Sequence, residues 1–566
     1  MRRFPLPGAL AFAAAVAASA VTAPATAQNA GAYLAGRQAF GTNDFGPAAR
    51  YYAEALARDP SNPALIEAAL TAQIGLGDID RAIPTARRLL QTGTESQVAY
   101  LALVADAAER GAWDALLQDI EAGQSVGPLF DGLVTAWAHV GRGDMSEAIA
   151  AFDEVIETPG VGAFGRFHKA LALAQAGDYE GAEEILASDE ELRLTRGGAI
   201  ARAEILSQLE RNEDALAVID ATFAGDLDPA LEDLVAKLQA GEAVPFDTVT
   251  SAADGVAEVY FTLASALNGE ATDNYTLIYT RLTTFLRPDH IGALLLTAEL
   301  LETLGRYELA TETYDRVPRD DPSFHAAELG RAAALNAQGR TDAAVEVLRQ
   351  LSETVDDMPA VWITLGDTLR QDERYEEARP AYDRAVELIG EPEQGDWIVF
   401  FARGISEERT GDWEAAEADF RTALDLNPGQ PQVLNYLGYS LVERNEKLDE
   451  ARALIEEAVA ARPDSGYITD SLGWILYRLG EYDEAVVHME KAVELMPVDP
   501  VVNDHLGDVL WAVGRQREAE FQWLRALSFD PEEEDAERIR RKLDVGLDAV
   551  LREEGEPPLA VAREDG

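Results

Sequence analysis

The chain has 566 residues, with 102 Asp and Glu against 47 Lys and Arg, which leaves a formal net charge of −55. This balance argues against nucleic acid and anionic membrane surfaces as partners, because both are bound by clustered cations. The chain has no Cys, which excludes disulfides, thiolate metal sites, a Cys nucleophile and a lipid anchor on cysteine.

The first 27 residues have the pattern of a cleaved secretory signal peptide. Arg2 and Arg3 precede an apolar, alanine-rich run over residues 8–23, and the small residues Ala25 and Ala27 follow. This order of basic, apolar and small-residue segments is typical of export signals. We therefore expect cleavage after Ala27 and a periplasmic protein without a lipid anchor or a transmembrane segment; the alternative is a leader retained as an anchor.

The remainder of the chain repeats one pattern about every 34 residues. Glycines recur at this spacing, alanines follow five and twelve residues after them, and prolines close the unit. Gly and Asn tolerate the left-handed backbone at a helix end. The glycine grid comprises Gly77, Gly111, Gly143, Gly177, Gly305, Gly339, Gly411, Gly480 and Gly514, with Asn43 and Asn212 on the same grid.

This pattern resembles the tetratricopeptide repeat (TPR), a 34-residue helix–turn–helix unit. In the clearest copy, residues 466–499, Gly473 lies mid-helix, Gly480 ends the first helix, and Ala485 and Ala492 face the helix crossing. The resemblance implies an all-α solenoid, a right-handed superhelix of about fourteen repeats. We expect the repeats to begin near residues 29, 63, 97, 129, 163, 198, 250, 291, 325, 359, 397, 431, 466 and 500.

Two segments depart from the repeat and set the predicted domain boundaries. Residues 229–255 contain a short helical pattern and then a non-helical stretch, which predicts an irregular joint between solenoids at 28–228 and 256–533. After the last repeat, apolar residues recur every four positions and predict one capping helix over 534–553. Its basic residues Arg538, Arg540, Arg541 and Lys542 fall outside the apolar stripe. Residues 554–566 are expected to form a disordered tail.

Motifs for catalysis or cofactors are missing from the sequence. There is no phosphate-binding GxxxxGK and no HExxH, so we predict a non-enzyme without cofactor or metal. Each of the six His is interpreted as a surface residue of a helix. An enzyme that uses the degenerate segment 190–290 remains an alternative, which a concave polar pocket in that segment would favour.

The first helices of the last three repeats carry the candidate binding residues. In TPR proteins these helices line the concave groove, so the resemblance implies that their aromatic, amide and carboxylate side chains contact a partner. Packing between neighbouring helices is an equally good interpretation for the Trp residues. The candidates are Asn435, Tyr439, Tyr467, Asp470, Trp474, Tyr477, Asp504, Asp508 and Trp511.

A closer resemblance covers residues 247–533. The strings VTSAADGVAEVYF (249–261), VLNYLGYSLVER (433–444) and SLGWILYRLGEYDEAV (471–486) are similar to exported bacterial TPR adaptors that partner a periplasmic carboxyl-terminal processing protease. The resemblance implies a protein-binding scaffold of the cell envelope that delivers substrates to such a protease. A general assembly or chaperone-like factor is the alternative, because this chain lacks the lipid-anchoring Cys of that branch.

Overall fold

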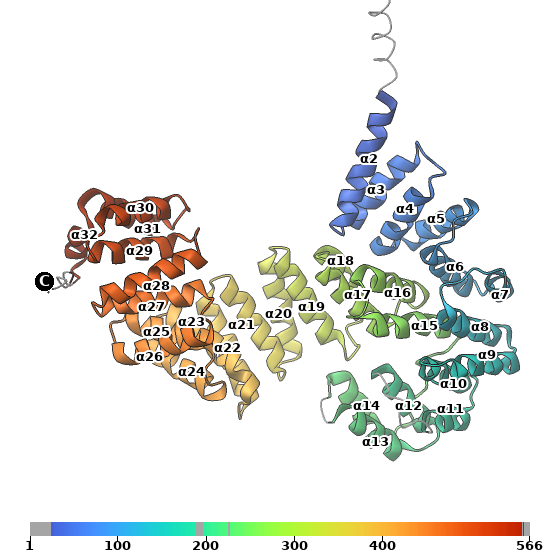
Figure 1. Ribbon diagram of the computed structural model, residues 1–566. Coiled ribbons are helices and arrows are strands. Elements are labelled where there is room, and N and C mark those ends of the chain that lie inside the picture. Colours follow the sequence, from blue (N-terminus) through green and yellow to red (C-terminus); the bar gives the residue numbers. More distant parts are fainter. Residues whose placement is uncertain (1–23, 188–195, 225–226, 557–558, 560–566) are drawn as a thin grey trace, which may run out of the picture. The chain divides into compact units, whose positions relative to one another are not determined.

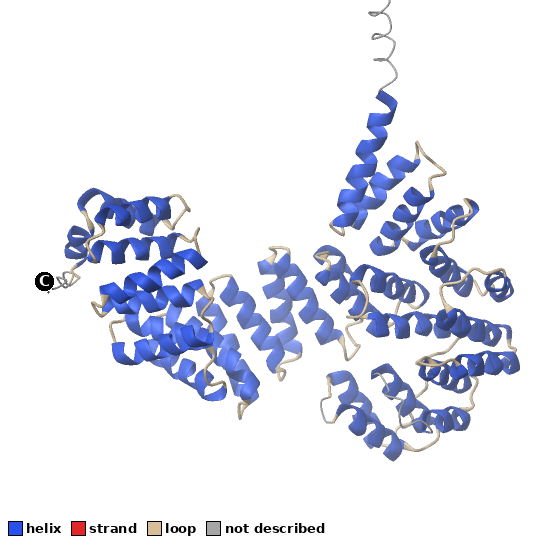
Figure 2. Cartoon of the chain, in the orientation of Figure 1, coloured by secondary structure: helices blue, strands red, loops and turns tan. Residues whose placement is uncertain are grey.

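The computed structural model describes residues 24–187, 196–224, 227–556 and 559, and within them the regular elements are all helices (Figures 1 and 2). The all-α prediction is therefore confirmed. Most of the predicted signal peptide, residues 1–23, falls outside the described residues, as do 557–558 and 560–566 of the predicted tail. No helix in the described part is long and apolar enough to cross a membrane.

The described chain divides into two compact units, Met1–Leu351 and Ser352–Gly566. The helices whose bounds begin in the first unit are α2 Pro24–Gly41, α3 Phe45–Leu56, α4 Pro63–Leu76, α5 Ile79–Gln91, α6 Gln97–Glu109, α7 Trp113–Glu121, α8 Pro128–Arg142, α9 Met145–Glu157, α10 Gly162–Gln175, α11 Tyr179–Ala187, α12 Arg196–Gln208, α13 Asn212–Phe223, α14 Pro229–Gln239, α15 Ala252–Leu267, α16 Asp273–Leu286, α17 Ile291–Thr303, α18 Tyr307–Tyr314, α19 Phe324–Ala337 and α20 Thr341–Thr354.

The second unit continues the same alternation of paired helices. It contains α21 Pro359–Gln371, α22 Tyr375–Ile389, the short 3₁₀ helix η1 Gln394–Asp396, α23 Trp397–Arg409, α24 Trp413–Leu426, α25 Pro431–Glu443, α26 Leu448–Ala461, α27 Gly466–Arg478, α28 Tyr482–Leu495, α29 Pro500–Ala512, α30 Gln516–Leu527, α31 Glu533–Val545 and α32 Leu547–Glu554. In both units the first helix of a pair begins within two residues of its predicted position, except α2, which begins five residues early.

The turns inside the helix pairs depend on a left-handed residue, as the glycine grid predicts. Gly480 and Gly514 have φ of 79° and 81°, and Asn43 reaches 58°. Asn212 differs from the prediction. It is the first residue of α13, and Glu210, two residues earlier, has the positive φ of 59°. The left-handed residue therefore lies at the end of the first helix of the pair, even where that position holds neither Gly nor Asn.

Close contact between paired helices depends on the mid-helix glycine. A Cβ atom added to Gly473 would lie 2.7 Å from the side chain of Met489, and one added to Gly507 would lie 2.3 Å from Trp523. Real Cβ atoms do not approach other atoms so closely, so the small residue is what admits the large side chain of the partner helix. Ala485 and Ala492 are fully buried at the same crossing.

The predicted joint at 229–255 does not separate the two compact units, whose boundary lies about 100 residues later. The segment consists of helix α14 and a non-helical stretch before α15. It returns the chain to the repeats that precede it. Helix α15 packs against α6, α8 and α10, and α16 packs against α4 and α6 (Figure 1). All four are first helices of their pairs, so the chain itself covers the face that these helices form.

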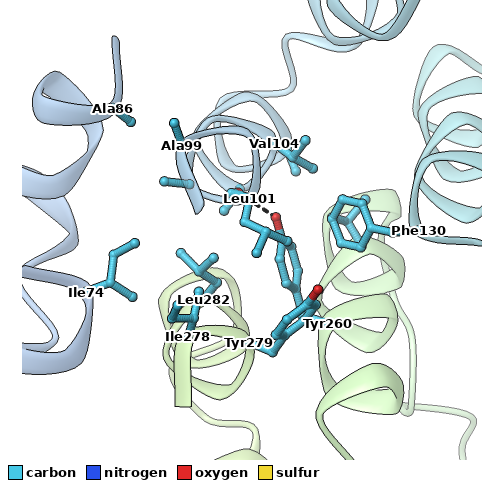
Figure 3. Close-up of a cluster of buried hydrophobic side chains, with 14 of the residues drawn as sticks. Ile74, Ala86, Ala99, Leu101, Val104, Phe130, Tyr260, Ile278, Tyr279 and Leu282 are labelled. Carbon is cyan, nitrogen blue, oxygen red and sulfur yellow. Dashed lines mark hydrogen bonds between the residues drawn. The ribbon is translucent and has the colours of Figure 1, made fainter. Parts of the chain in front are cut away.

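The core between the returning helices and the early repeats is large and apolar. Tyr260 of α15 is fully buried and donates its hydroxyl to the carbonyl oxygen of Leu101, 2.6 Å away on α6 (Figure 3). Its ring makes an edge contact with Phe130 of α8, with centroids 5.1 Å apart. From α16, Ile278 and Leu282 are buried in the same cluster. Burial on this scale makes α15 and α16 a permanent part of the first unit.

The end of the chain has two helices where one was predicted. Gly546, with φ of 82°, separates α31 from α32. The predicted apolar stripe is retained: Ile539, Leu547 and Leu551 are buried against the last repeat. The break turns α32 back beside α31, so the stripe is divided between two short helices.

Candidate partner-binding groove

Eight of the nine candidate residues line two adjoining pockets along α25, α27 and α29. The first pocket, about 270 Å³, is lined in part by Asn435, Tyr439, Tyr467 and Asp470. The second, about 450 Å³, is lined in part by Tyr439, Trp474, Tyr477, Asp504 and Asp508. The two pockets share Tyr439, Val501 and His505. Helices one repeat apart thus place these side chains along one continuous groove.

A stack of three rings forms one wall of this groove. Trp474 lies on Tyr477 with centroids 4.9 Å apart and on His505 with centroids 4.0 Å apart, and both ring pairs are within 18° of parallel. The indole Nε1 of Trp474 donates to Glu443 at 2.9 Å. Trp474 and Tyr477 are each more than nine-tenths buried, so the stack presents its edges to the pocket instead of open faces.

His505 is a site residue that the sequence analysis missed. It was interpreted as a surface histidine, yet it is buried, and its Nδ1 lies 2.9 Å from Oδ2 of Asp470. Burial lowers the pKa of His505. The hydrogen bond to Asp470 and the negative charges of Asp470, Asp504 and Asp508 outweigh this effect, so the pKa of His505 is above its usual value. His168, also expected at the surface, is fully buried and accepts from the indole of Trp137.

Asp504 and Asp508 are occupied by the chain's own terminal helix. Lys542 of α31 places its Nζ 2.7–2.9 Å from both oxygens of each carboxylate, and its side chain is 0% exposed. Lys542 was expected outside the buried stripe, so this placement corrects the prediction. Asp508 also accepts from the indole of Trp523 at 2.9 Å. These two acids therefore hold α31 onto α29 and are not free to bind a partner.

Trp511 lies outside both pockets. Its Nε1 donates to Asp548 of α32 at 3.0 Å, and its ring packs 5.4 Å from that of Trp523. Its role in the structure is to seat the terminal helices against the last repeat, as the packing interpretation of the Trp residues proposed.

A polar cleft of about 450 Å³ lies in the first unit, in the segment where the alternative enzyme was considered. Glu204 accepts from the backbone N–H and hydroxyl of Thr248, whose carbonyl accepts from Arg287 at 2.6 Å. His290 accepts from the backbone N–H of Ala293 at Nδ1, so its Nε2 carries the proton and faces Glu258 at 3.2 Å.

The polar groups of this cleft are paired with one another across the loop that precedes α15. Burial raises the pKa of Glu204 to about 8, and the charge of Asp247 adds to the shift. The hydrogen bond from Ala293 fixes His290 in one tautomer. Among the described residues, no three His, Asp or Glu side chains converge as metal ligands would. The contacts support a structural role for the cleft, which holds α12 and the loop against α15 and α17.

The sequence matches a tetratricopeptide repeat family model at residues 33–96, 133–190, 295–359, 329–392, 401–466 and 440–500. These segments together cover more than half of the chain, and each spans paired helices of the structure. The chain belongs to the tetratricopeptide repeat family. TPR proteins of this kind are in general non-enzymatic scaffolds that mediate protein–protein contacts.

Two curated proteins resemble parts of this TPR chain. TPR repeat-containing protein PA4667 of Pseudomonas aeruginosa is 31% identical over 174 residues, which is 30% of this chain and 28% of that protein. Protein O-mannosyl-transferase TMTC1 of Homo sapiens is 26% identical over 182 residues, 31% of this chain and 20% of that protein. The chain thus spans less than a third of the length of either relative.

Solved structures with similar helices include the APC/C hetero-tetramer Cut9–Hcn1, at 16% identity and a TM-score of 0.38, covering 80% of this chain and 96% of that chain. MamA AMB-1 matches at 23% identity and a TM-score of 0.26, covering 30% of this chain and 97% of that chain.

Proposed function

We propose that this TPR protein is a non-enzymatic scaffold that binds a segment of another protein in the groove along α25, α27 and α29. The observation that carries the proposal is the pair of adjoining pockets on the first helices of three consecutive repeats, walled by Tyr439, Trp474 and His505; α31 and α32 complete the second pocket. Aromatic side chains with a few fixed polar groups are what extended peptides bind.

The second unit is the better place for a partner than the early repeats of the first. In the first unit, α15 and α16 cover the corresponding face of α4, α6, α8 and α10. A partner segment would have to displace Tyr260 and Leu282, both fully buried. The first pocket of the second unit needs no such displacement, because no residue of α31 or α32 lines it, and Tyr467 at its rim is 44% exposed.

We also propose that the scaffold acts in the bacterial cell envelope, where it brings substrates to a periplasmic carboxyl-terminal processing protease. The signal-peptide pattern of residues 1–27 and the resemblance of residues 247–533 to exported TPR adaptors support this assignment. A general assembly or chaperone-like factor for envelope complexes would use the same groove. The two differ in the partner: the first requires a protease and its substrates, the second an assembly intermediate.

A photo-crosslinking amino acid at position 467 tests the groove directly in the full-length protein expressed in a bacterial cell. We expect defined crosslinked species with Tyr467 replaced and none with Val487 replaced, since Val487 is 62% exposed on α28, away from the groove. Trp474→Ala should reduce the yield at position 467. Equal crosslinking from both positions, or none from 467, would contradict the groove assignment.

Mass spectrometry of the crosslinked species then separates the two envelope functions. A protease, or a hydrolase that the protease degrades, supports the adaptor, whereas assembly factors alone support the chaperone-like function. The location is tested separately by a reporter enzyme fused after residue 60 that is active only outside the cytoplasm. Activity in the cytoplasm alone would refute the envelope proposal and leave the scaffold proposal standing.

A further inference from the structure

Two residues that line the first pocket carry a buried acceptor oxygen that the protein leaves unpaired. Asn435 on α25 and Asp470 on α27 are 8% and 6% exposed. In the described part of the chain, neither the Oδ1 of Asn435 nor the Oδ1 of Asp470 has a hydrogen-bond donor. The large majority of buried side-chain polar atoms in folded proteins have a hydrogen-bond partner. Two unpaired acceptors on neighbouring helices of one pocket point to a donor supplied by another molecule.

The surrounding contacts hold Asp470 in one orientation. Its second oxygen, Oδ2, is bonded to His505, and the imidazole is in turn stacked on Trp474. The indole is fixed by its hydrogen bond to Glu443. The free oxygen of Asp470 is therefore positioned before any ligand arrives, which lowers the cost of ordering the site on binding.

The charge of the lining indicates a cationic donor. The pocket is lined by the carboxylates of Asp470 and Asp499, and among its described lining residues there is no Lys or Arg. His505 is the one lining group that becomes cationic, and it already faces Asp470. Tyr436, Tyr439 and Tyr467 add aromatic rings, which attract cations electrostatically. A carboxylate in this position would meet further acceptors and be repelled.

The shape favours lysine over arginine. The remaining walls include the apolar side chains of Met496, Val501 and Val502, which suit an aliphatic stem. A lysine ammonium is a compact charge with three donors that point in different directions, whereas arginine presents a planar fork that pairs best with two oxygens of one carboxylate. Here the free acceptors come from two different side chains, and one oxygen of Asp470 is already used.

We propose that the first pocket binds a lysine side chain of the partner segment, with its ammonium donating to Oδ1 of Asp470 and Oδ1 of Asn435. This inference rests on the proposed scaffold function and adds the chemistry by which the groove selects its partner. It does not depend on whether that partner is a protease, a substrate or an assembly factor.

Calorimetric titration of the full-length protein with N-acetyl-lysine methylamide tests the pocket without knowledge of the partner. We expect this probe to bind at least tenfold more tightly than the norleucine analogue, which has a similar stem and no charge. Asp470→Asn and Asn435→Leu should each weaken lysine binding at least fivefold. Asp483→Asn, which makes the same charge change at an exposed site of the same repeat, should leave binding unchanged.

Several results would overturn the inference. Equal binding of the norleucine analogue would show that the pocket selects apolar stems, and tighter binding of the arginine analogue would refute the ammonium assignment. Unchanged lysine binding in Asn435→Leu refutes the two-acceptor site even if Asp470→Asn fails to fold. Absence of binding by all three probes also overturns it. In each case, crosslinking at position 467 still decides the scaffold function, so the two failures remain distinguishable.

Discussion

Lys542 shows how much a single residue can depend on its partners. It is fully buried, and Asp504 and Asp508 surround its ammonium at 2.7–2.9 Å, which offsets the cost of burying its charge. Arg538 adds a second cation, 3.5 Å from Asp508. A chain with a net charge of −55 has many carboxylates in solvent, but these two are part of a buried ion cluster that fixes the end of the last repeat.

Lys542→Met should destabilise the second unit by about 3–5 kcal/mol, because it leaves two buried carboxylates without their counter-charge. Urea unfolding followed by circular dichroism measures the loss. Arg540→Met is the control: Arg540 pairs with Glu533 in solvent, so its loss should change stability by less than about 1 kcal/mol. A triple variant that adds Asp504→Asn and Asp508→Asn to Lys542→Met should recover part of the lost stability. Equal losses of stability in Lys542→Met and Arg540→Met would contradict the buried ion cluster.

The raised pKa of Glu204 predicts that the stability of the first unit depends on pH. Its pKa is raised by burial to about 8 in the folded protein, against a usual value of 4.5. The folded state therefore holds a proton that the unfolded state releases between these values, and the stabilisation is complete below about pH 4.5 and is lost as pH rises through 8. Glu204→Gln should flatten this part of the curve of melting temperature against pH. An unchanged slope in the variant would assign the effect to other groups.

At the scale of the helix, the two helices of a pair cross closely at one glycine of the first helix. The first helix contributes a glycine and the second a large side chain that fills the space, as with Gly366 and Tyr382, Gly404 and Phe420, or Gly507 and Trp523. The spacing of sixteen residues within each of these pairs follows from the length of the two helices and the turn. The same contact therefore recurs in successive repeats although the filling residue varies.

Gly507→Ala should destabilise the second unit by about 1–3 kcal/mol, because the new methyl group overlaps the fully buried ring of Trp523. Thermal unfolding provides the measurement. Gly395→Ala is the matched control, since a Cβ there meets no atom within 4 Å and the backbone is not left-handed. The crossing model predicts little change in this control, and equal losses at the two sites would count against it.

At the scale of the whole molecule, the described chain comprises two units with different uses of the same repeat. In the first, the helices α15 and α16 return and fill the face of the early repeats, with Arg281 buried and donating to the carbonyl of Gly75. In the second, the corresponding face retains pockets with unpaired acceptors. In the first unit, returning helices thus fill the face of the early repeats, whereas in the second unit the terminal helices cover only part of the corresponding face.

Unfolding in urea should show two transitions, because a repeat protein is stabilised by contacts between neighbouring elements and need not unfold as a single unit. Hydrogen exchange followed by mass spectrometry assigns each transition to its peptides. We expect Lys542→Met to shift the transition of residues 352–556 and Glu204→Gln to change the pH dependence only of the transition of the first unit. Coincident loss of protection in all peptides would show a single cooperative unit.

Much of this architecture was predictable from the sequence, because the information is local and repeated. The glycine grid predicted the turns, and the repeat starts agree with the helix pairs because each pair is built from residues within about 34 positions. The resemblance to TPR proteins supplied the groove residues, because in that family equivalent positions on the first helices of successive repeats share the concave face. Eight of the nine line the two pockets, and their contact with a partner remains a prediction.

The tertiary structure alone decided which of these residues are free. Tyr260 contacts Leu101 across 159 residues, and Lys542 reaches Asp504 from a helix beyond the last repeat. Neither contact follows from the period of the sequence, because a periodic pattern specifies which face a residue shares but not which distant segment covers that face. The sequence by itself therefore determined the helix pairs and the face of the repeats on which the candidate residues lie. The return of α15 and α16 and the burial of Lys542 arise from packing between segments that the repeat does not relate.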